Sequence, residues 1–326
     1  MDIDVLGALA VRENGVSITP TAPKPRQVLA LLALHADQVV PVSALIEELW
    51  GGEPPRSART TLQTYVLQLR ALIATALEAG RDDGRGGSGS EGAGAGAGAA
   101  SGGGAGGAVR TAKDVLVTLP GGYLLNSNGG TSDVREFDRL AGTGYRAMDA
   151  GDFPGAARLL REALALWSGP AFADVQGGVQ LEMETRRLEE TRLCALDQRI
   201  EADLRLGRHR ELLAELTVLA SRYRTHENLH GQFMLALHRS GRRGEALDVY
   251  QRLRGTLVRE LGLEPSAALR RLQRSILMAG PENVAEAAVE AGGVGVGVGV
   301  GAGVGVGAGV GGVGVGGVGG ERLVRV

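Results

Sequence analysis

The sequence predicts a mainly α-helical protein with small β elements, and two observations lead to this fold class. Short strand-like stretches occur near the N-terminus and at residues 115–125, on either side of three predicted helices. From Val134 to about Met278 the apolar pattern is helical throughout, and the turn glycines Gly207 and Gly241 are 34 residues apart, the period of a tetratricopeptide hairpin. Together these features predict a winged helix-turn-helix domain followed by an all-α, tetratricopeptide-like helical array.

The N-terminal region is predicted to contain short strands followed by three helices. Residues 2–19 alternate and turn at ENG, which is typical of a short β-hairpin or meander. Pro23 and Pro25 precede the apolar stretch RQVLALLALHAD, where we expect the first helix. The second helix covers VSALIEELW, with Ser43 as its N-cap. The third helix runs from about residue 57 to residue 77.

The third helix has two chemically different faces. One is an apolar stripe at helical spacing, formed by Leu62, Val66, Leu69 and Ile73. The opposite face carries hydrogen-bond donors and no carboxylate. Residues 54–81 contain four arginines and one glutamate, a local charge of +3 on a chain whose net charge is −2. Taken alone, this face fits either a solvated surface helix or a helix that lies against a phosphate backbone.

The order of strands, three helices and a closing hairpin is that of a winged helix. In such a domain the third helix enters the major groove, and the hairpin VLVTLPGGYLL at 115–125 is the wing. Arginine can then pair with phosphate or guanine, and glutamine or threonine can reach base edges. The residues that we expect to contact DNA are Arg56, Arg59, Thr60, Thr61, Gln63, Thr64, Gln68 and Arg70.

Two low-complexity segments help to set the predicted domain boundaries. Residues 80–108 are mostly Gly, Ala and Ser, so we expect a flexible insertion between the third helix and the wing. Residues 282–326 are rich in Gly and Val; glycine at alternate positions weakens strand pairing, so we expect a disordered tail. The winged-helix domain is therefore predicted at 1–125, and the helical array at 132–279.

Composition excludes several kinds of site. Cys194 is the single cysteine, so an intrachain disulfide and a cysteine metal cluster are impossible, and its apolar neighbours predict a small core residue. His226 and His230 have i, i+4 spacing without an HExxH frame, so we expect no metal and no cofactor. No nucleophile–base pair or nucleotide loop suggests an enzyme. Without a signal peptide or an apolar span, we expect a cytoplasmic, nucleoid-associated protein with no membrane partner.

Several motifs resemble those of the Streptomyces antibiotic regulatory protein family. They are LQTYVLQLR, LPGGYLL, GPAFADV, LEETRLCALDQRIEADLRLGRHRELLAEL and GQFMLALHRSGRRGEALDVYQRLRGTLVRELGLEPSAALRRLQRSIL. The resemblance covers about residues 2–78 and 109–278. Its winged-helix motifs are shared with OmpR-type DNA-binding domains, whereas the C-terminal motifs are more specific. It implies an OmpR-type winged helix followed by a bacterial transcriptional activation domain.

The resemblance also implies a function and partners. Members of this family activate transcription of secondary-metabolite (antibiotic) biosynthetic genes, bind direct repeats in double-stranded DNA near promoters and help to recruit RNA polymerase holoenzyme. Direct repeats require a head-to-tail contact between protomers, so we expect self-association on DNA. The alternative is a tetratricopeptide-like protein-interaction scaffold without specific DNA binding.

This chain departs from the OmpR pattern at the predicted interface. Related recognition helices often carry arginine where this chain has Leu67, Gln68 and Ala71. The wing tip, which often carries arginine, has Leu119 or Pro120 here. We therefore expect modest affinity for a single repeat and a dependence on cooperative binding.

Overall fold

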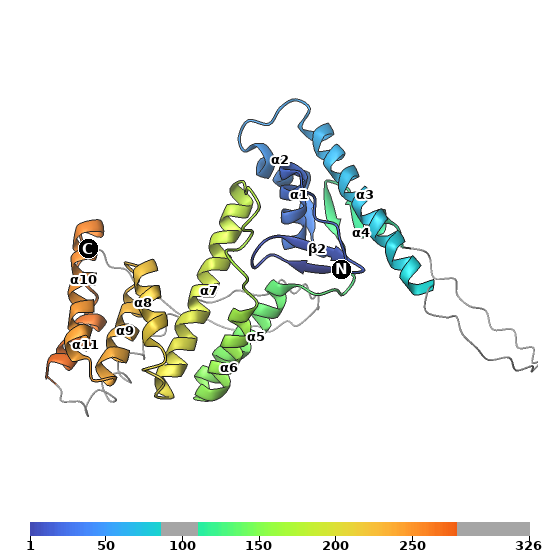
Figure 1. Ribbon diagram of the computed structural model, residues 1–326. Coiled ribbons are helices and arrows are strands. Elements are labelled where there is room, and N and C mark those ends of the chain that lie inside the picture. Colours follow the sequence, from blue (N-terminus) through green and yellow to red (C-terminus); the bar gives the residue numbers. More distant parts are fainter. Residues whose placement is uncertain (86–109, 279–326) are drawn as a thin grey trace, which may run out of the picture.

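The computed structural model describes residues 1–85 and 110–278, and these are called the described residues below. Within them the protein is mainly helical with small β sheets, which confirms the predicted fold class. A compact N-terminal part contains the sheets, and a row of helices extends away from it (Figure 1). The expected flexibility of the Gly-rich insertion from residue 86 onward, and of the Gly/Val-rich tail, falls outside the described residues.

The chain begins with an antiparallel sheet formed by β1 (Asp2–Asp4), β2 (Ala10–Glu13) and β3 (Val16–Ser17), in that order. The turn between β2 and β3 consists of Asn14 and Gly15, whose φ angles are 52° and 78°. Positive φ at both central positions is what a tight two-residue hairpin turn requires, and Asn-Gly tolerates it best. The meander predicted from the ENG turn is therefore confirmed.

Three long helices follow: α1 (Pro23–Leu34), α2 (Val42–Trp50) and α3 (Ala58–Arg85). All three were predicted, but α3 continues past its predicted end at residue 77. Residues 80–85, predicted to be part of the flexible insertion, therefore belong to this helix.

The start of α2 differs from the sequence prediction. The strand β4 (Val39–Pro41) directly precedes α2 and was not predicted. Pro41 occupies the N-cap position in an extended conformation, with φ −62° and ψ 145°, so the prediction of Ser43 as N-cap is wrong. The reason is long-range pairing, because β4 holds the chain extended up to Pro41 and the helix can begin directly after it.

The wing is built from a short helix and a hairpin, α4 (Ala112–Val115), β5 (Leu116–Leu119) and β6 (Gly122–Leu125). Pro120 and Gly121 form the turn, and Gly121 has a φ of 84°, a value that glycine adopts without strain. Strand β4 pairs with β6, so the sheet order is β4-β6-β5 and the predicted hairpin becomes part of a three-stranded sheet.

The rest of the described chain is a helical array. Its members are α5 (Asp133–Asp149), α6 (Phe153–Ala165), α7 (Val179–Arg205), α8 (Leu213–Arg222), α9 (Glu227–Arg239), α10 (Arg243–Leu261) and α11 (Ala267–Met278). Most successive helices pack against one another, and α7 also packs on α9, so that the helices form a row (Figure 1). Gly151, Gly207 and Gly241 follow α5, α7 and α9 with φ angles of 75°, 77° and 81°. Left-handed glycines at these helix ends agree with the tetratricopeptide-like hairpins predicted from the turn spacing.

One prediction within the array is wrong. Cys194 on α7 is exposed, not a core residue. Its neighbours Leu193 and Ala195 are buried instead, because successive residues of a helix point in different directions. Neighbouring side chains keep some water from the Cys194 thiol, and this desolvation, followed by the charges of Glu190 and Asp197, raises its pKa, which favours the unreactive protonated form.

The apolar core does not stop at the end of the wing. One cluster of buried residues extends from Ile3 through the three N-terminal helices and the wing to α5, α6 and the first half of α7, as far as Ala195. A second cluster begins at Leu193 and continues to Ile276. Packing is therefore continuous across the predicted domain boundary between residues 125 and 132.

Candidate nucleic-acid interface

The orientation of α3 is set by its apolar stripe. Leu62, Val66, Leu69 and Ile73 are each exposed by only 1–2% and belong to the first core. Helix α3 packs on α1 and α2, as the prediction required. Tyr123 on β6 is buried, and Tyr65 on α3 is partly buried against the same core, so both tyrosines pack inward.

The outward face of α3 presents most of the predicted DNA contacts. Thr60, Gln63, Thr64 and Gln68 are exposed, whereas Thr61 lies at the edge of this face and is partly buried. The Thr64 hydroxyl donates to the carbonyl oxygen of Thr60 at 3.1 Å, so its proton is used within the helix. Its lone pairs and methyl group remain for other contacts.

Two arginines flank the start of α3. Arg56 lies in the turn before the helix and Arg59 in its first turn, and both are exposed. Among the described residues neither forms an ion pair, and the first turn of α3 contains no acidic residue. These two guanidinium groups are therefore available to an anion outside the chain.

Arg70 has a different environment from the other candidates. Its Nε and Nη2 atoms donate to the carbonyl oxygen of Leu116 at 3.1 and 2.7 Å, and Nη2 also donates to the Thr118 hydroxyl at 2.8 Å. Arg70 thus ties the recognition helix to the first wing strand, a role that its sequence position did not reveal. A phosphate contact through its remaining amino group stays a prediction.

The wing tip is poor in charge. Pro120 is exposed and Leu119 is partly buried, so no cation occupies the place where related wings often carry arginine. Lys113 on α4 is exposed, and no described residue pairs with it. Leu67 on α3 was not among the predicted contacts, yet it is 63% exposed on the outward face.

A second feature connects the winged helix to the helical array. Glu48 of α2 is only 2% exposed, and its carboxylate lies at the N-terminus of α7. Oε1 accepts from the backbone N–H of Gly178 at 2.5 Å, and Oε2 accepts from those of Gln180 and Leu181 at 2.9 and 3.1 Å. These are donors that a helix start leaves without an intrahelical acceptor, and a negative charge there is favoured by the helix dipole.

The loop between α6 and α7 reinforces this junction. Backbone N–H groups of Ser168, Phe172 and Ala173 donate to carbonyl oxygens in the N-terminal segment 5–7 at 2.9–3.0 Å. Gly7 allows this close approach, because a Cβ there would meet the Ser168 hydroxyl at 1.9 Å. Asp174 then accepts from the backbone N–H of Leu9 at 2.8 Å and pairs with Arg26 of α1.

Asp133 fastens the start of α5 to the same N-terminal segment. Its Oδ2 accepts from the backbone N–H groups of Val5 and Leu6 at 2.6 and 2.7 Å. Burial raises the pKa of this carboxyl above its usual range, although the hydrogen bonds from the two backbone groups act in the opposite direction.

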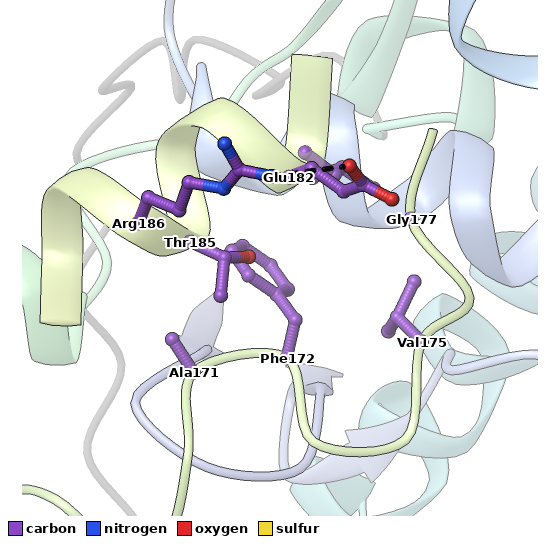
Figure 2. A pocket seen from close by; sticks show the side chains of 8 residues that line it. Ala171, Phe172, Val175, Gly177, Glu182, Thr185 and Arg186 are labelled. Carbon is purple, nitrogen blue, oxygen red and sulfur yellow. Dashed lines mark ion pairs between the residues drawn. The ribbon is translucent and has the colours of Figure 1, made fainter. Parts of the chain in front are cut away.

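An open cavity of about 350 Å³ lies beside the junction, between the α6–α7 loop and the start of α7 (Figure 2). It is lined by Ala171, Phe172, Val175, Gly177, Leu181, Glu182, Thr185 and Arg186. The charged side chains of its wall, Glu182 and Arg186, pair with each other at 3.8 Å between Oε2 and Nη2. The cavity therefore offers no unpaired charge to a ligand.

The described residues contain no group of three or more His, Cys, Asp or Glu side chains that could hold a metal ion. His226 accepts from the backbone N–H of Leu229 at 3.3 Å as the N-cap of α9, and His230 Nδ1 lies 3.0 Å from the carbonyl oxygen of His226. Both histidines have structural partners within the chain.

No helix among the described residues is long and apolar enough to span a membrane.

Comparison with known proteins connects both parts of the chain to transcription. Residues 17–81 match the family described as "Transcriptional regulatory protein, C terminal", and residues 132–277 match the "Bacterial transcriptional activator domain". The chain is 49% identical to the regulatory protein DnrI of Streptomyces peucetius over 296 residues, which are 89% of this chain and 99% of DnrI. The chain belongs to the Streptomyces antibiotic regulatory protein family.

Other members and neighbours of this family differ in length. The chain is 34% identical to the regulatory protein AfsR of Streptomyces coelicolor over 85% of its own length, but it spans only 24% of AfsR. The solved structure of Mycobacterium tuberculosis EmbR, in complex with a low-affinity phosphopeptide, matches 89% of this chain and 68% of EmbR at 30% identity, with a TM-score of 0.70. This Streptomyces antibiotic regulatory protein is thus a transcriptional regulator with an OmpR-like winged helix and a helical activator domain.

Proposed function

We propose that the chain is a sequence-specific DNA-binding transcriptional activator of a secondary-metabolite biosynthetic gene cluster. The observation that carries this proposal is the outward face of α3, which is exposed, rich in hydrogen-bond donors and free of acidic residues in its first turn. In a winged helix this is the face that enters the major groove. A scaffold without specific DNA binding would not need to keep its acidic residues off this surface.

The contacts divide by chemistry. Arg56 and Arg59 at the start of α3 neutralise phosphates, because they are exposed cations without partners among the described residues. Gln63 and Gln68 on the exposed face read base edges, since an amide side chain offers both a donor and an acceptor. Phosphate contacts position the helix and supply affinity for any sequence, whereas base contacts supply specificity.

Arg70 contributes to both recognition helix and wing. Its bonds to Leu116 and Thr118 hold β5 in a fixed position beside α3. The wing is then already ordered before it enters the adjacent groove, so binding does not cost the conformational entropy of ordering it. A phosphate contact by the same guanidinium group is part of the proposal and has its own test below.

The helical array is proposed to join protomers on tandem repeats and to contact RNA polymerase holoenzyme beside the promoter, in a nucleoid-associated complex. The junction at Glu48 and Asp133 supports this, because it fixes the direction in which the array extends from the recognition helix. Two chains on direct repeats then point the same way, and a head-to-tail contact can form between them.

The proposal is tested with the full chain. Truncation after residue 125 would remove Asp133 and Asp174, the partners of backbone donors in the N-terminal segment. The chain is used to select duplexes from a random library, and the selected sequence is placed as a single, a tandem and an inverted repeat for gel-shift and footprinting assays. We expect cooperative binding to the tandem form and stimulated transcription from it with purified polymerase.

A matched pair of variants separates DNA contact from general charge. Arg59→Ala should weaken binding and lower the salt slope of binding by about one unit, the change expected for one lost phosphate contact. Arg158→Ala, at an exposed arginine on α6, should leave both unchanged. No preference of the chain for the selected duplex over a scrambled one would favour the scaffold function instead.

A further inference from the structure

Leu67 is an exposed leucine that belongs to neither of the two apolar cores. It lies on α3 opposite the apolar stripe and is 63% exposed, whereas the stripe residues are exposed by 1–2%. It is one helical turn from Thr64 and from Ala71, both of which are also exposed. We call Thr64, Leu67 and Ala71 the apolar line of the recognition helix.

The apolar line runs along the middle of the face that we propose to enter the major groove. The Thr64 hydroxyl has its proton engaged with the carbonyl oxygen of Thr60 at 3.1 Å, so Thr64 has no donor left for a base. Leu67 and Ala71 have no polar side-chain atoms at all. The line therefore offers no hydrogen-bond donor to the N7 and O6 acceptors of guanine, although Gln63 and Gln68 beside it can supply one.

The major groove presents a single apolar group, the C5-methyl of thymine. An exposed leucine that is pressed into this groove gains free energy by contacting a methyl group. Opposite cytosine that contact is missing, and the neighbouring N4 amino donor is left without a hydrogen-bond partner. We propose that Leu67 contacts a thymine C5-methyl in each repeat and thereby selects T·A over C·G at that position. This inference rests on the proposed DNA-binding function and assigns one specificity-determining residue of that site.

The test removes the methyl group alone. The duplex selected from the random library is synthesised with each thymine replaced, one at a time, by deoxyuridine, and binding of the full chain is measured by fluorescence anisotropy. We expect one thymine in each repeat at which the replacement weakens binding by about fourfold, the effect of removing one buried methyl-sized group. At the same position, 5-methylcytosine should bind more tightly than cytosine.

A double-mutant cycle assigns the methyl contact to Leu67. Leu67→Ala should bind the thymine and deoxyuridine duplexes equally, while Leu67→Met should retain most of the discrimination because it remains long and apolar. Leu72→Ala is the matched control: Leu72 lies on the same helix, is 36% exposed and is not part of the apolar line, so discrimination should persist. Leu67→Ala should also keep the thermal midpoint of the parent chain, since an exposed side chain contributes little to stability.

Three outcomes would overturn the inference. Equal binding of every deoxyuridine duplex by the parent chain would show that no methyl group is read. Undiminished discrimination by Leu67→Ala would assign the methyl to another residue. Absence of any preference for the selected duplex over a scrambled one would remove the proposed function and this inference together, whereas the first two outcomes leave sequence-specific binding intact.

Discussion

Replacing Glu48 by alanine tests whether the junction between the winged helix and the helical array contributes strongly to stability. The Glu48 carboxylate accepts three backbone N–H groups at the start of α7, at 2.5, 2.9 and 3.1 Å. The Gln27 side chain of α1 donates to the same carboxylate at 2.8 Å and to the Glu48 carbonyl at 2.7 Å. Alanine would leave three α7 donors without an acceptor and would break one of the two Gln27 bonds.

The magnitude follows from the number and burial of these bonds. A hydrogen bond to a charged group contributes about 1.5–3 kcal/mol, and a helix N-cap about 0.5–2 kcal/mol. Each buried donor left without an acceptor costs about 1–3 kcal/mol, but these contributions overlap and water enters the gap, so they do not add, and we expect about 3–5 kcal/mol as a whole. We expect Glu48→Ala to lower the free energy of unfolding by that amount.

The neighbouring residue provides the control. Glu47 is exposed, and among the described residues its carboxylate accepts only from the Gln180 side chain, at 3.1 Å. Glu47→Ala should therefore change the free energy of unfolding by less than about 0.5 kcal/mol. Urea unfolding of the full chain, followed by circular dichroism, measures both variants. Equal stability of Glu48→Ala and Glu47→Ala would refute the reasoning, because it would mean that the cap at α7 is energetically neutral.

Three further predictions concern the recognition helix and the N-terminal segment. Leu69→Ala should lower the free energy of unfolding by about 2–5 kcal/mol, because it leaves a cavity in the core. Gln63→Ala should change the free energy of unfolding by less than about 0.5 kcal/mol and should alter DNA preference. The reverse pattern in urea unfolding would show that α3 is rotated about its axis. Arg70→Ala should weaken DNA binding for all sequences, and a salt titration distinguishes its roles: the slope falls by about one unit if Arg70 touches phosphate and stays constant if it only holds the wing. Burial raises the pKa of Asp133 in the folded chain above the ordinary value of 3.8 that it has in the unfolded chain. Between these two pKa values the folded chain binds more protons than the unfolded chain, so the free energy of unfolding falls as the pH rises through this window. Asp133→Asn should lack this component in urea unfolding measured from about pH 4 to about pH 7, and an unchanged pH profile would contradict the role of burial.

The sequence allowed the recognition helix to be predicted because its information is local. The stripe of Leu62, Val66, Leu69 and Ile73 has a helical period, and burial of that stripe fixes which residues face outward. The wing was predictable for the same reason, since Pro-Gly-Gly between β-branched stretches specifies a tight turn. The exposed faces of both elements follow directly from the residues that must be buried.

The elements that could not be predicted depend on distant partners. Strand β4 has only three residues and exists because β6 pairs with it from more than 80 positions further along the chain. Glu47 and Glu48 are adjacent acids in the same helix, and their local sequence gives no sign that one is exposed and the other caps α7, 130 residues away. Arg70 likewise looked like a surface cation until β5 supplied its acceptors.

The junction and the recognition helix together limit how two chains can meet on DNA. Helix α2 packs on α3 and, through Glu48, on the start of α7, so the array has a fixed direction relative to the groove that α3 would occupy. Chains on tandem repeats would then be related by the translation and rotation of the DNA between the repeats, about 34–36 Å per turn. A fixed array would reach its neighbour only at particular values of that rotation, whereas a loosely tethered array would tolerate many spacings. If the chain binds tandem repeats as proposed, the buried cap at α7 would bear on promoter choice as well as on stability, because it would convert the distance between repeats into a condition for contact between protomers.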